Sequence, residues 1–369
     1  MIAGEETATS GDCIIPNKEV AISDSDKFVT QILNGPNEQC QENFRMDKPV
    51  FYKLCHILQT RGLLRHTNRI KIEEQLAIFL FIIGHNLRTR AVQDLFGYSG
   101  ETISRHFNNV LNAVTSISTS FFQSTSPDVD QFDPYFKDCI GVVDCIHMPV
   151  MVGVDEQGPF RNGHNGLLTQ NVLVASSFDL RFNYVLAGWE GSASDQQVLD
   201  AALTRPNKLQ VPQGKYYIVD CNYQNLPGFI APYQGGVSEP KGMFNERHKV
   251  LHRAVDRAFG ALKERFPILL SAPPYPLQTQ VKLVIAACAL HNYVRLEKPD
   301  DFVFRMFEED TLLAETTEEE DRGMALEEEE NEGHEHGLFG PEEVEDSLRL
   351  RDEIASNLWN HYVQNLPTF

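Results

Sequence analysis

Four aspartates have the residue type and the setting that a divalent-metal site requires. Asp144 and Asp220 each close a short apolar run, in GVVD and KYYIVD, and Asp195 follows the apolar run NYVLAGWE. Asp256 lies 36 residues after Asp220, in the helical pattern HRAVDRAFGALKERF. Mg²⁺ and Mn²⁺ prefer oxygen ligands and keep water in their shell. Two such ions, roughly 4 Å apart, can hold the attacking and leaving oxygens of a phosphodiester. The pattern predicts metal-dependent phosphoryl transfer.

The segments around these acids predict an α/β domain over residues 135–296. GVVD, NVLVASS, NYVLAGWE and KYYIVD are short β-rich runs separated by turn residues. Ser194 and Gln197 have the spacing of a capping box, which predicts that Asp195 begins a helix. Residues 248–266 and 281–296 have the apolar patterns of helices. Three acids are therefore expected at strand or helix ends and the fourth, Asp256, within a helix.

Residues 41–120 read as helices in a helix-turn-helix-like arrangement. A helical pattern ends at Gly97, a typical helix C-terminus, and Ser99 can cap the next helix. Arg88, Arg90 and Arg105 bring positive charge to this unit, which makes them candidates for DNA contact. Glu101 lies on the expected recognition helix, and a three-helix packing unit without DNA contact is the alternative reading.

The negative charge is concentrated in one segment. The chain has 369 residues and a net charge of −20, of which −17 falls in residues 308–346. The remaining residues are close to neutral, so the body is compatible with a DNA partner. Residues 308–346 are expected to be disordered because so few of them are apolar. A mobile segment over residues 1–40 and a C-terminal helix over residues 347–369 complete the expected organisation.

The cysteines and the apolar runs indicate the compartment. The seven cysteines form no CxxC pair, which favours free thiols in a reducing environment. Residues 1–20 lack the basic and apolar regions of a secretory signal. The longest apolar run, Leu76–Gly84, is too short to span a bilayer, so no membrane association is expected.

Longer stretches around these acids resemble the Harbinger-type transposases and their domesticated plant descendants. The similarity covers roughly residues 40–295 and includes PFRNGHNGLLTQNVLVASSFD, GWEGSASDQQVL, KYYIVDCNYQNLPGF and FNERHKVLHRAVDRAFGALKERFPIL. It implies an RNase H-like nuclease fold with an acidic Asp-Asp-Glu metal triad that uses Mg²⁺ or Mn²⁺. Asp144, Asp220 and Asp256 match the catalytic triad, and Asp195 is a further metal-site candidate. Arg161 and Asn162 match a segment that could contact DNA.

The resemblance also implies a nuclear location, with the cytoplasm left open as a second one, and DNA as a partner. Relatives act with a Myb-like DNA-binding protein or within chromatin complexes. Three departures point away from full activity. Cys145-Ile146 replaces Gly-Thr, and Cys221-Asn222 replaces small residues. Asp256 replaces Glu, which shortens the side chain by about 1.5 Å, the length of one C–C bond.

Each acid also has a simpler reading. Asp144 and Asp220 could be solvated strand-end or turn residues. Asp195 could simply stabilise the N-terminus of its helix through its negative charge. Asp256 could pair with basic residues on its own helix. Two functions follow: an attenuated metal-dependent endonuclease acting on DNA, and a catalytically inactive chromatin-associated interaction factor.

Overall fold

A computed structural model describes residues 24–67, 69–122, 133–163, 165–235, 238–314 and 338–365. Its centre is a mixed sheet with the order β3-β2-β1-β4-β5. The antiparallel strands are β1 (Cys139–Pro149), β2 (Thr169–Ser176) and β3 (Phe182–Glu190). The short strand β4 (Tyr216–Ile218) is parallel to β1, and β5 (Phe229–Ile230) is parallel to β4. The expected α/β architecture is therefore present, and it is compatible with the nuclease fold that the resemblance implies.

The two faces of the sheet carry different cores because neighbouring residues of a strand point to opposite sides. Val142 of β1 and Ile218 of β4 belong to the larger core, whereas Val143 and Val219 belong to the smaller one. β2 is buried along its whole length: its central residues 172–175 are apolar on both faces, and the polar residues at its two ends are buried as well. The larger core lies on the side of the long helices, and the smaller core on the side of α8 (Asp195–Thr204).

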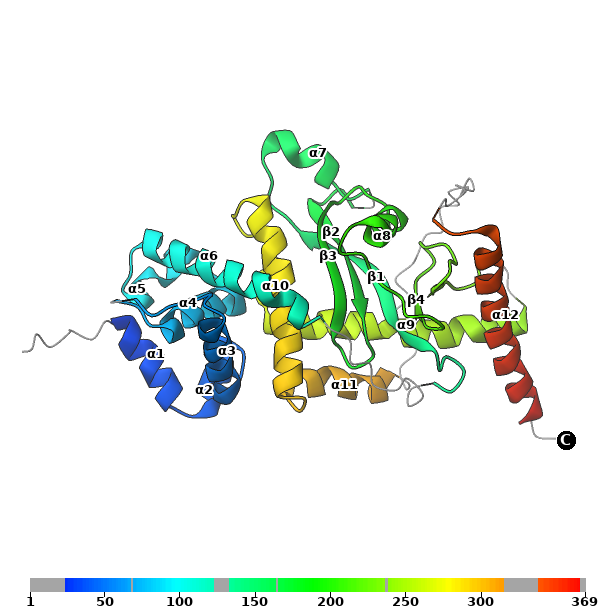
Figure 1. Cartoon of the computed structure of the whole chain (residues 1–369), viewed down its shortest axis with the longest axis horizontal. Helices are drawn as coiled ribbons and strands as arrows, with labels where there is room; N and C mark the ends of the chain where they lie inside the picture. The colour runs from blue at the N-terminus through cyan, green and yellow to red at the C-terminus, as the bar shows by residue number, and fades with distance from the viewer. Residues whose placement is uncertain are drawn as a thin grey trace, which may run out of the picture.

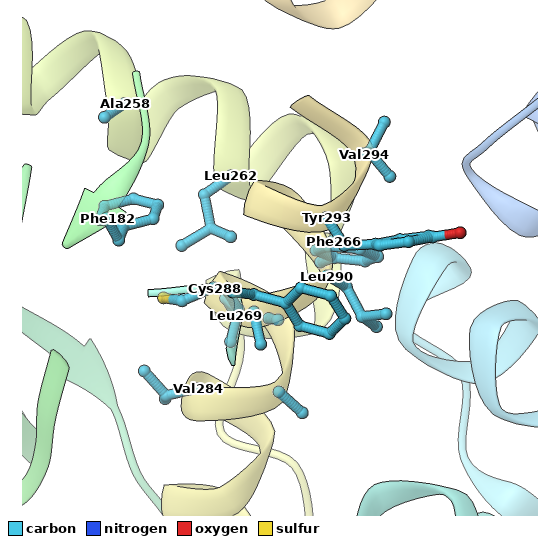
Figure 2. Packing of buried hydrophobic residues seen from close by; sticks show 14 of the residues in the cluster. Phe182, Ala258, Leu262, Phe266, Leu269, Val284, Cys288, Leu290, Tyr293 and Val294 are labelled. Atoms are coloured by element: carbon cyan, nitrogen blue, oxygen red, sulfur yellow. The ribbon is translucent and has the colours of Figure 1, made fainter. Parts of the chain in front are cut away.

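The long helices α9 (Glu239–Arg265) and α10 (Leu277–Glu297) cover the larger core. α9 crosses the sheet and contacts β1, β2 and β4, while α10 packs on β3 (Figure 1). Figure 2 shows Leu262 of α9 and Phe266, the residue that follows α9, beside Leu290 and Tyr293 of α10, with Phe182 of β3 at the same core. α9 is thereby fixed across the strands that carry Asp144 and Asp220.

The N-terminal unit is helical, as expected, and begins earlier than predicted. Its α-helices are α1 (Asp24–Asn34), α2 (Asn37–Phe44), α3 (Lys48–Thr60), α4 (Ile72–His85), α5 (Gln93–Phe96) and α6 (Gly100–Ile117). The prediction of a mobile segment over residues 1–40 is wrong for residues 24–40. Val29, Ile32 and Leu33 form a buried helical stripe there, which the polar composition of the segment concealed. Residues 1–23 lie outside the described residues.

The helices that the sequence assigned to a helix-turn-helix-like unit are α4, α5 and α6. Gly97 has the left-handed conformation expected at a helix end, with φ of 62°, and the Ser99 hydroxyl accepts a hydrogen bond from the Thr102 amide. The expected helix over residues 88–96 is only a 3₁₀ turn, η1 (Thr89–Val92), followed by the single turn of α5. α6 packs against both α4 and α10.

The helical unit and the sheet domain share one hydrophobic core, which extends from Val29 to Leu358. Polar contacts cross the same boundary. The Tyr293 hydroxyl donates to the Val50 carbonyl (2.8 Å), and the Arg265 guanidinium donates to the Arg45 carbonyl (2.7 Å) and pairs with buried Asp301. A shared core of this kind fixes the helical unit against the nuclease-like domain instead of leaving it on a free linker.

The C-terminal part contains α11 (Phe302–Ala314) and α12 (Pro341–Gln364). The disorder expected over residues 308–346 is therefore wrong at both ends, and residues 315–337 lie outside the described part of the chain. α12 begins earlier than residue 347 because Pro341 and Glu343 suit a helix start. It packs on α9 (Figure 1), and Ile354, Ala355 and Leu358 are buried along it.

The remaining short elements are η2 (Ser118–Ser120), η4 (Val154–Glu156), α7 (Gln157–Phe160) and η5 (Pro267–Leu270). Among the described helices, none combines the length and the apolar character needed to cross a bilayer.

Candidate metal centre

Asp144 and Asp220 occupy equivalent positions on neighbouring strands. Val142 of β1 is paired with Ile218 of β4, and each aspartate comes two residues after its member of this pair. Because β1 and β4 are parallel, both chains run toward the same edge of the sheet. The two-residue period places both carboxylates on the side of Val142 and Ile218, which is the side that α9 covers.

Asp195 reaches the same edge from the opposite face. It is the first residue of α8, whose start is fixed by the predicted capping box between Ser194 and Gln197. One carboxylate oxygen of Asp195 accepts a hydrogen bond from the Asn171 side chain (3.0 Å), and the other accepts one from Asn222 (3.3 Å). The Asn222 side chain also donates to Asp220 (3.0 Å). Asn222 therefore connects the α8 acid to the β4 acid.

Asp256 lies on α9, and its side chain is exposed. Its negative charge nevertheless contributes to raising the pKa of Asp144, after the larger contributions of burial, Asp220 and Asp195. The charges of the other three sequence-predicted acids thus all act on Asp144. Asp256 is the most remote of them in electrostatic effect, as expected for a carboxylate one methylene shorter than Glu.

Burial and neighbouring negative charges both raise the pKa of Asp144 and of Asp220. Burial is the main reason that the pKa of Asp144 lies well above its ordinary value, and Asp220 is the strongest of the charged causes. Burial, with the charge of Asp195, raises the pKa of Asp220 to about 6, although the Asn222 amide opposes this rise. Buried carboxylates that repel one another favour a bound proton or a bound cation. Their charge is appropriate for a divalent ion.

The donor set fits a sparsely ligated hard ion. Within the described ranges, no three His, Cys, Asp or Glu side chains are close enough together to hold one ion. Mg²⁺ commonly takes only one or two protein carboxylates and completes its shell with water and substrate phosphate. Asp144 and Asp220 satisfy that smaller requirement. Asp195 is a weaker candidate ligand because both of its oxygens already accept hydrogen bonds from asparagine side chains.

The residues that replace the family's small ones lie at the same edge. The half-buried Cys145 thiol is beside Asp195 and Tyr223, and burial, then the Asp195 charge, raises its pKa. Cys221 is half-buried, and burial followed by the Asp220 charge raises its pKa. Both thiols are therefore kept protonated and are poor ligands in this state. The Cys145 amide donates to the Asp144 carboxylate (2.8 Å), which fixes that side chain.

Two functional positions were missed in the sequence. The sequence marks Asn222 only as part of a departure from the family pattern, and it gives no sign that the Asn171 side chain holds Asp195. Asn222 follows Asp220 by two residues, and its backbone amide donates to the Asp220 carboxylate (2.9 Å) in a turn that the Asp-Cys-Asn spacing could have indicated. The contact with Asp195, 27 residues away, had no local signal.

The candidate DNA-contact residues differ in their exposure to solvent. Arg88, Arg90 and Arg105 are exposed on η1 and α6, and Arg161 is exposed near α7. Asn162 is only 5% exposed, because its backbone closes the turn to Leu167. DNA contact by its side chain stays a prediction, and its low exposure makes Asn162 the weakest of these candidates.

Comparison with known proteins agrees with this geometry. Residues 143–292 match a family model described as a DDE superfamily endonuclease, and residues 21–116 match a domain of unknown function, DUF8040. An Arabidopsis thaliana protein named "Protein ALP1-like" is 22% identical over 303 residues, which cover 73% of this chain and 74% of the relative. No solved structure matches the chain.

The mixed sheet, the placement of Asp144 within β1 and of Asp220 just beyond β4, and the matched family model together indicate a DDE-type endonuclease domain over residues 143–292. Over these residues the chain is similar to the Harbinger-type transposase-derived proteins, and over 73% of its length it is similar to the ALP1-like relative.

Proposed function

We propose that the protein is a metal-dependent endonuclease derived from a transposase, with attenuated activity, that hydrolyses phosphodiester bonds of DNA. The observation that supports it most directly is the equivalent placement of Asp144 and Asp220 beyond the Val142–Ile218 pair. In this proposal the two carboxylates hold Mg²⁺ or Mn²⁺, and Asp256 completes the catalytic set from α9. A divalent ion at this edge supplies charge stabilisation to a phosphodiester during its displacement.

The chain's own residues have separate tasks. Asp144 is held by the Cys145 amide, and Asp220 by the Asn222 amide, so the central carboxylates are oriented before substrate arrives. Asp256 is exposed and faces an incoming DNA strand more readily than the buried pair. Its side chain is shorter than the Glu of the family, which is the reason for proposing a reduced rate.

In this proposal, exposed basic side chains bind the DNA phosphates. Arg88, Arg90, Arg105 and Arg161 are the candidates, and phosphate contacts of this kind give sequence-independent affinity. The acidic character of the whole chain limits this affinity. A nuclear location and a Myb-like or chromatin partner that supplies further DNA contact belong to the same proposal.

A second candidate function is that of a catalytically inactive, chromatin-associated interaction factor. The observation that favours it is the engagement of Asp195 and Asp220 by Asn222, together with the absence of any three-residue ligand group among the described residues. A protein of this kind would retain the fold and its partner surfaces without the reaction.

Cleavage of supercoiled plasmid DNA with Mn²⁺ separates the two functions. The endonuclease proposal expects nicking by the wild-type protein, loss of nicking in Asp144→Asn, and no loss in Asp300→Asn, which changes an exposed acid between α10 and α11. If the wild-type protein and Asp144→Asn leave the plasmid equally intact, the endonuclease proposal is wrong and the interaction factor is favoured.

A further inference from the structure

Asn222 has an unusual set of partners at the candidate metal centre. Its side-chain nitrogen donates to a carboxylate oxygen of Asp220 (3.0 Å) and to one of Asp195 (3.3 Å). Its backbone amide donates to the second oxygen of Asp220 (2.9 Å). One exposed asparagine therefore supplies three hydrogen bonds to two acids that come from different faces of the sheet.

The chemistry of the partners fixes the orientation of this amide. Ionised carboxylates only accept hydrogen bonds, so the NH₂ group, and not the carbonyl oxygen, must face Asp220 and Asp195. The NH₂ group carries two hydrogens, which matches two acceptors. It therefore partly neutralises the same oxygens that a cation would use. Mg²⁺ requires its oxygen ligands at about 2.0–2.1 Å, which leaves no room for a donor hydrogen on the same lone pair.

Asp195 is held in the position that this bridge requires. Its other oxygen accepts from the Asn171 side chain (3.0 Å), and Asn171 also donates to the Ala193 carbonyl (3.2 Å). Asn171 is fully buried on β2, so this support is rigid. Both oxygens of Asp195 are therefore engaged by asparagine side chains, so Asp195 holds Asn222 in place and is not positioned as a metal ligand.

We propose that Asn222, anchored by its hydrogen bond to Asp195, competes with the divalent cation for the Asp220 carboxylate and thereby sets the cation affinity of the site. This inference rests on the proposed function, because it assumes that the cation binds at Asp220. Cation binding then requires the Asn222 side chain to turn away from Asp220, and the site is weaker than one with a small residue at position 222. Asn222 is a positioning and selectivity residue, not a catalytic one.

Calorimetric titration with Mn²⁺ alone tests the competition without any activity measurement. Asn222→Gly removes both side-chain hydrogen bonds and is expected to lower the dissociation constant of Mn²⁺ about tenfold, the effect of one to two net hydrogen bonds. Asn222→Asp keeps the size of the side chain and replaces the donor by an acceptor, so it should bind Mn²⁺ at least as tightly as the glycine variant. Asn207→Gly, the same change in an exposed turn after α8, should leave the affinity unchanged.

The outcomes separate the inference from the function on which it rests. If the wild-type protein binds Mn²⁺ and neither Asn222 variant binds it more tightly, the competition is wrong while the metal site stands. If no form binds Mn²⁺, both are wrong. Asp220→Asn combined with Asn222→Gly should cancel the gain, and a gain that persists would place the ion elsewhere and overturn the inference. If the glycine variant does not fold, Asn222→Asp decides the question.

Discussion

Asp144 and Asp220 are separated by 75 intervening residues, yet each lies two residues beyond the same cross-strand pair, Val142 and Ile218. Parallel pairing makes the two positions adjacent without any direct bond between the side chains. Burial raises the pKa of both carboxyls, with the charge of Asp220 adding to the rise at Asp144 and the charge of Asp195 adding to the rise at Asp220. A bound cation would neutralise these carboxylates and relieve the unfavourable charge.

The first prediction concerns pH in the absence of divalent ions. The pKa of Asp220 rises from 3.8 to about 6 on folding, so the folded state holds its proton more firmly than the unfolded state. Below pH 3.8 Asp220 is protonated in both states and does not lower the free energy of unfolding. As the pH rises toward 6, Asp220 ionises more readily in the unfolded state, so the free energy of unfolding falls, and the full loss is reached above pH 6. Asp220→Asn should therefore be more stable than the wild-type protein at pH 8, by on the order of 1–3 kcal/mol, with the difference disappearing near pH 4.

Urea unfolding at several pH values in chelator measures this difference. Asp300→Asn is the control, since partners lower the pKa of Asp300, beginning with the hydrogen bond to Lys298, and its loss should give no gain at pH 8. A difference between Asp220→Asn and wild type that does not depend on pH would contradict the assignment of the effect to the carboxyl charge.

The second prediction concerns the shorter third acid. Asp256→Glu adds one methylene on the exposed side of α9 and brings the carboxylate toward Asp144, so Mn²⁺-dependent nicking should increase about tenfold or more. Asp300→Glu makes the same chemical change away from the site and should not alter the rate. Unchanged nicking in Asp256→Glu would show that the missing methylene does not limit the reaction, and attention would pass to Cys145 and Ile146.

The third prediction concerns the boundary between the helical unit and the sheet domain. Arg265→Met leaves buried Asp301 without its cationic partner and removes the contact with the Arg45 carbonyl. The free energy of unfolding should fall by about 3–5 kcal/mol. Arg105→Met, on the exposed face of α6, should change it by less than about 0.5 kcal/mol. Chemical denaturation compares the two variants, and equal stabilities would refute a structural role for the Arg265–Asp301 pair.

The fourth prediction concerns the acidic residues between α11 and α12. Residues 315–337 contain 11 acids and one base. Tethered charges of this kind compete with DNA phosphate for basic side chains such as Arg88, Arg90 and Arg105. Replacing every Glu and Asp in this segment by Gln and Asn should tighten non-specific DNA binding at low salt, and the gain should shrink as salt rises. Equal binding of both forms at low salt would leave the segment without an autoinhibitory role.

Much of the fold was readable from local patterns. The strands that carry Asp144 and Asp220, the helix that Asp195 begins and the helix that carries Asp256 all have the predicted place, because periodicity and capping are local signals. The helix α1 was missed because its apolar stripe lies in a polar segment, and α12 was predicted too short. The range expected to be disordered was too wide because its ends contain good helix formers.

The site was only partly readable. The sequence indicates which acids matter, but not the partners that reach them from other elements. The hydrogen bonds of Asn171 and Asn222 to Asp195 depend on how α8 meets the sheet edge, and the burial of Asn162 depends on a turn to Leu167. Contacts of this kind are set by tertiary packing, which single-chain spacing does not specify.

The thermal stability of the wild-type protein and of Asp144→Asn with and without Mn²⁺ tests the central claim most directly. A ligand that binds only the folded state raises the melting temperature, and at a hundredfold excess over its dissociation constant it contributes about 2.7 kcal/mol. The account predicts a clear rise with Mn²⁺ in the wild-type protein and a much smaller rise in Asp144→Asn. Equal shifts in the two proteins, or none in either, would contradict a divalent-metal centre at Asp144 and Asp220.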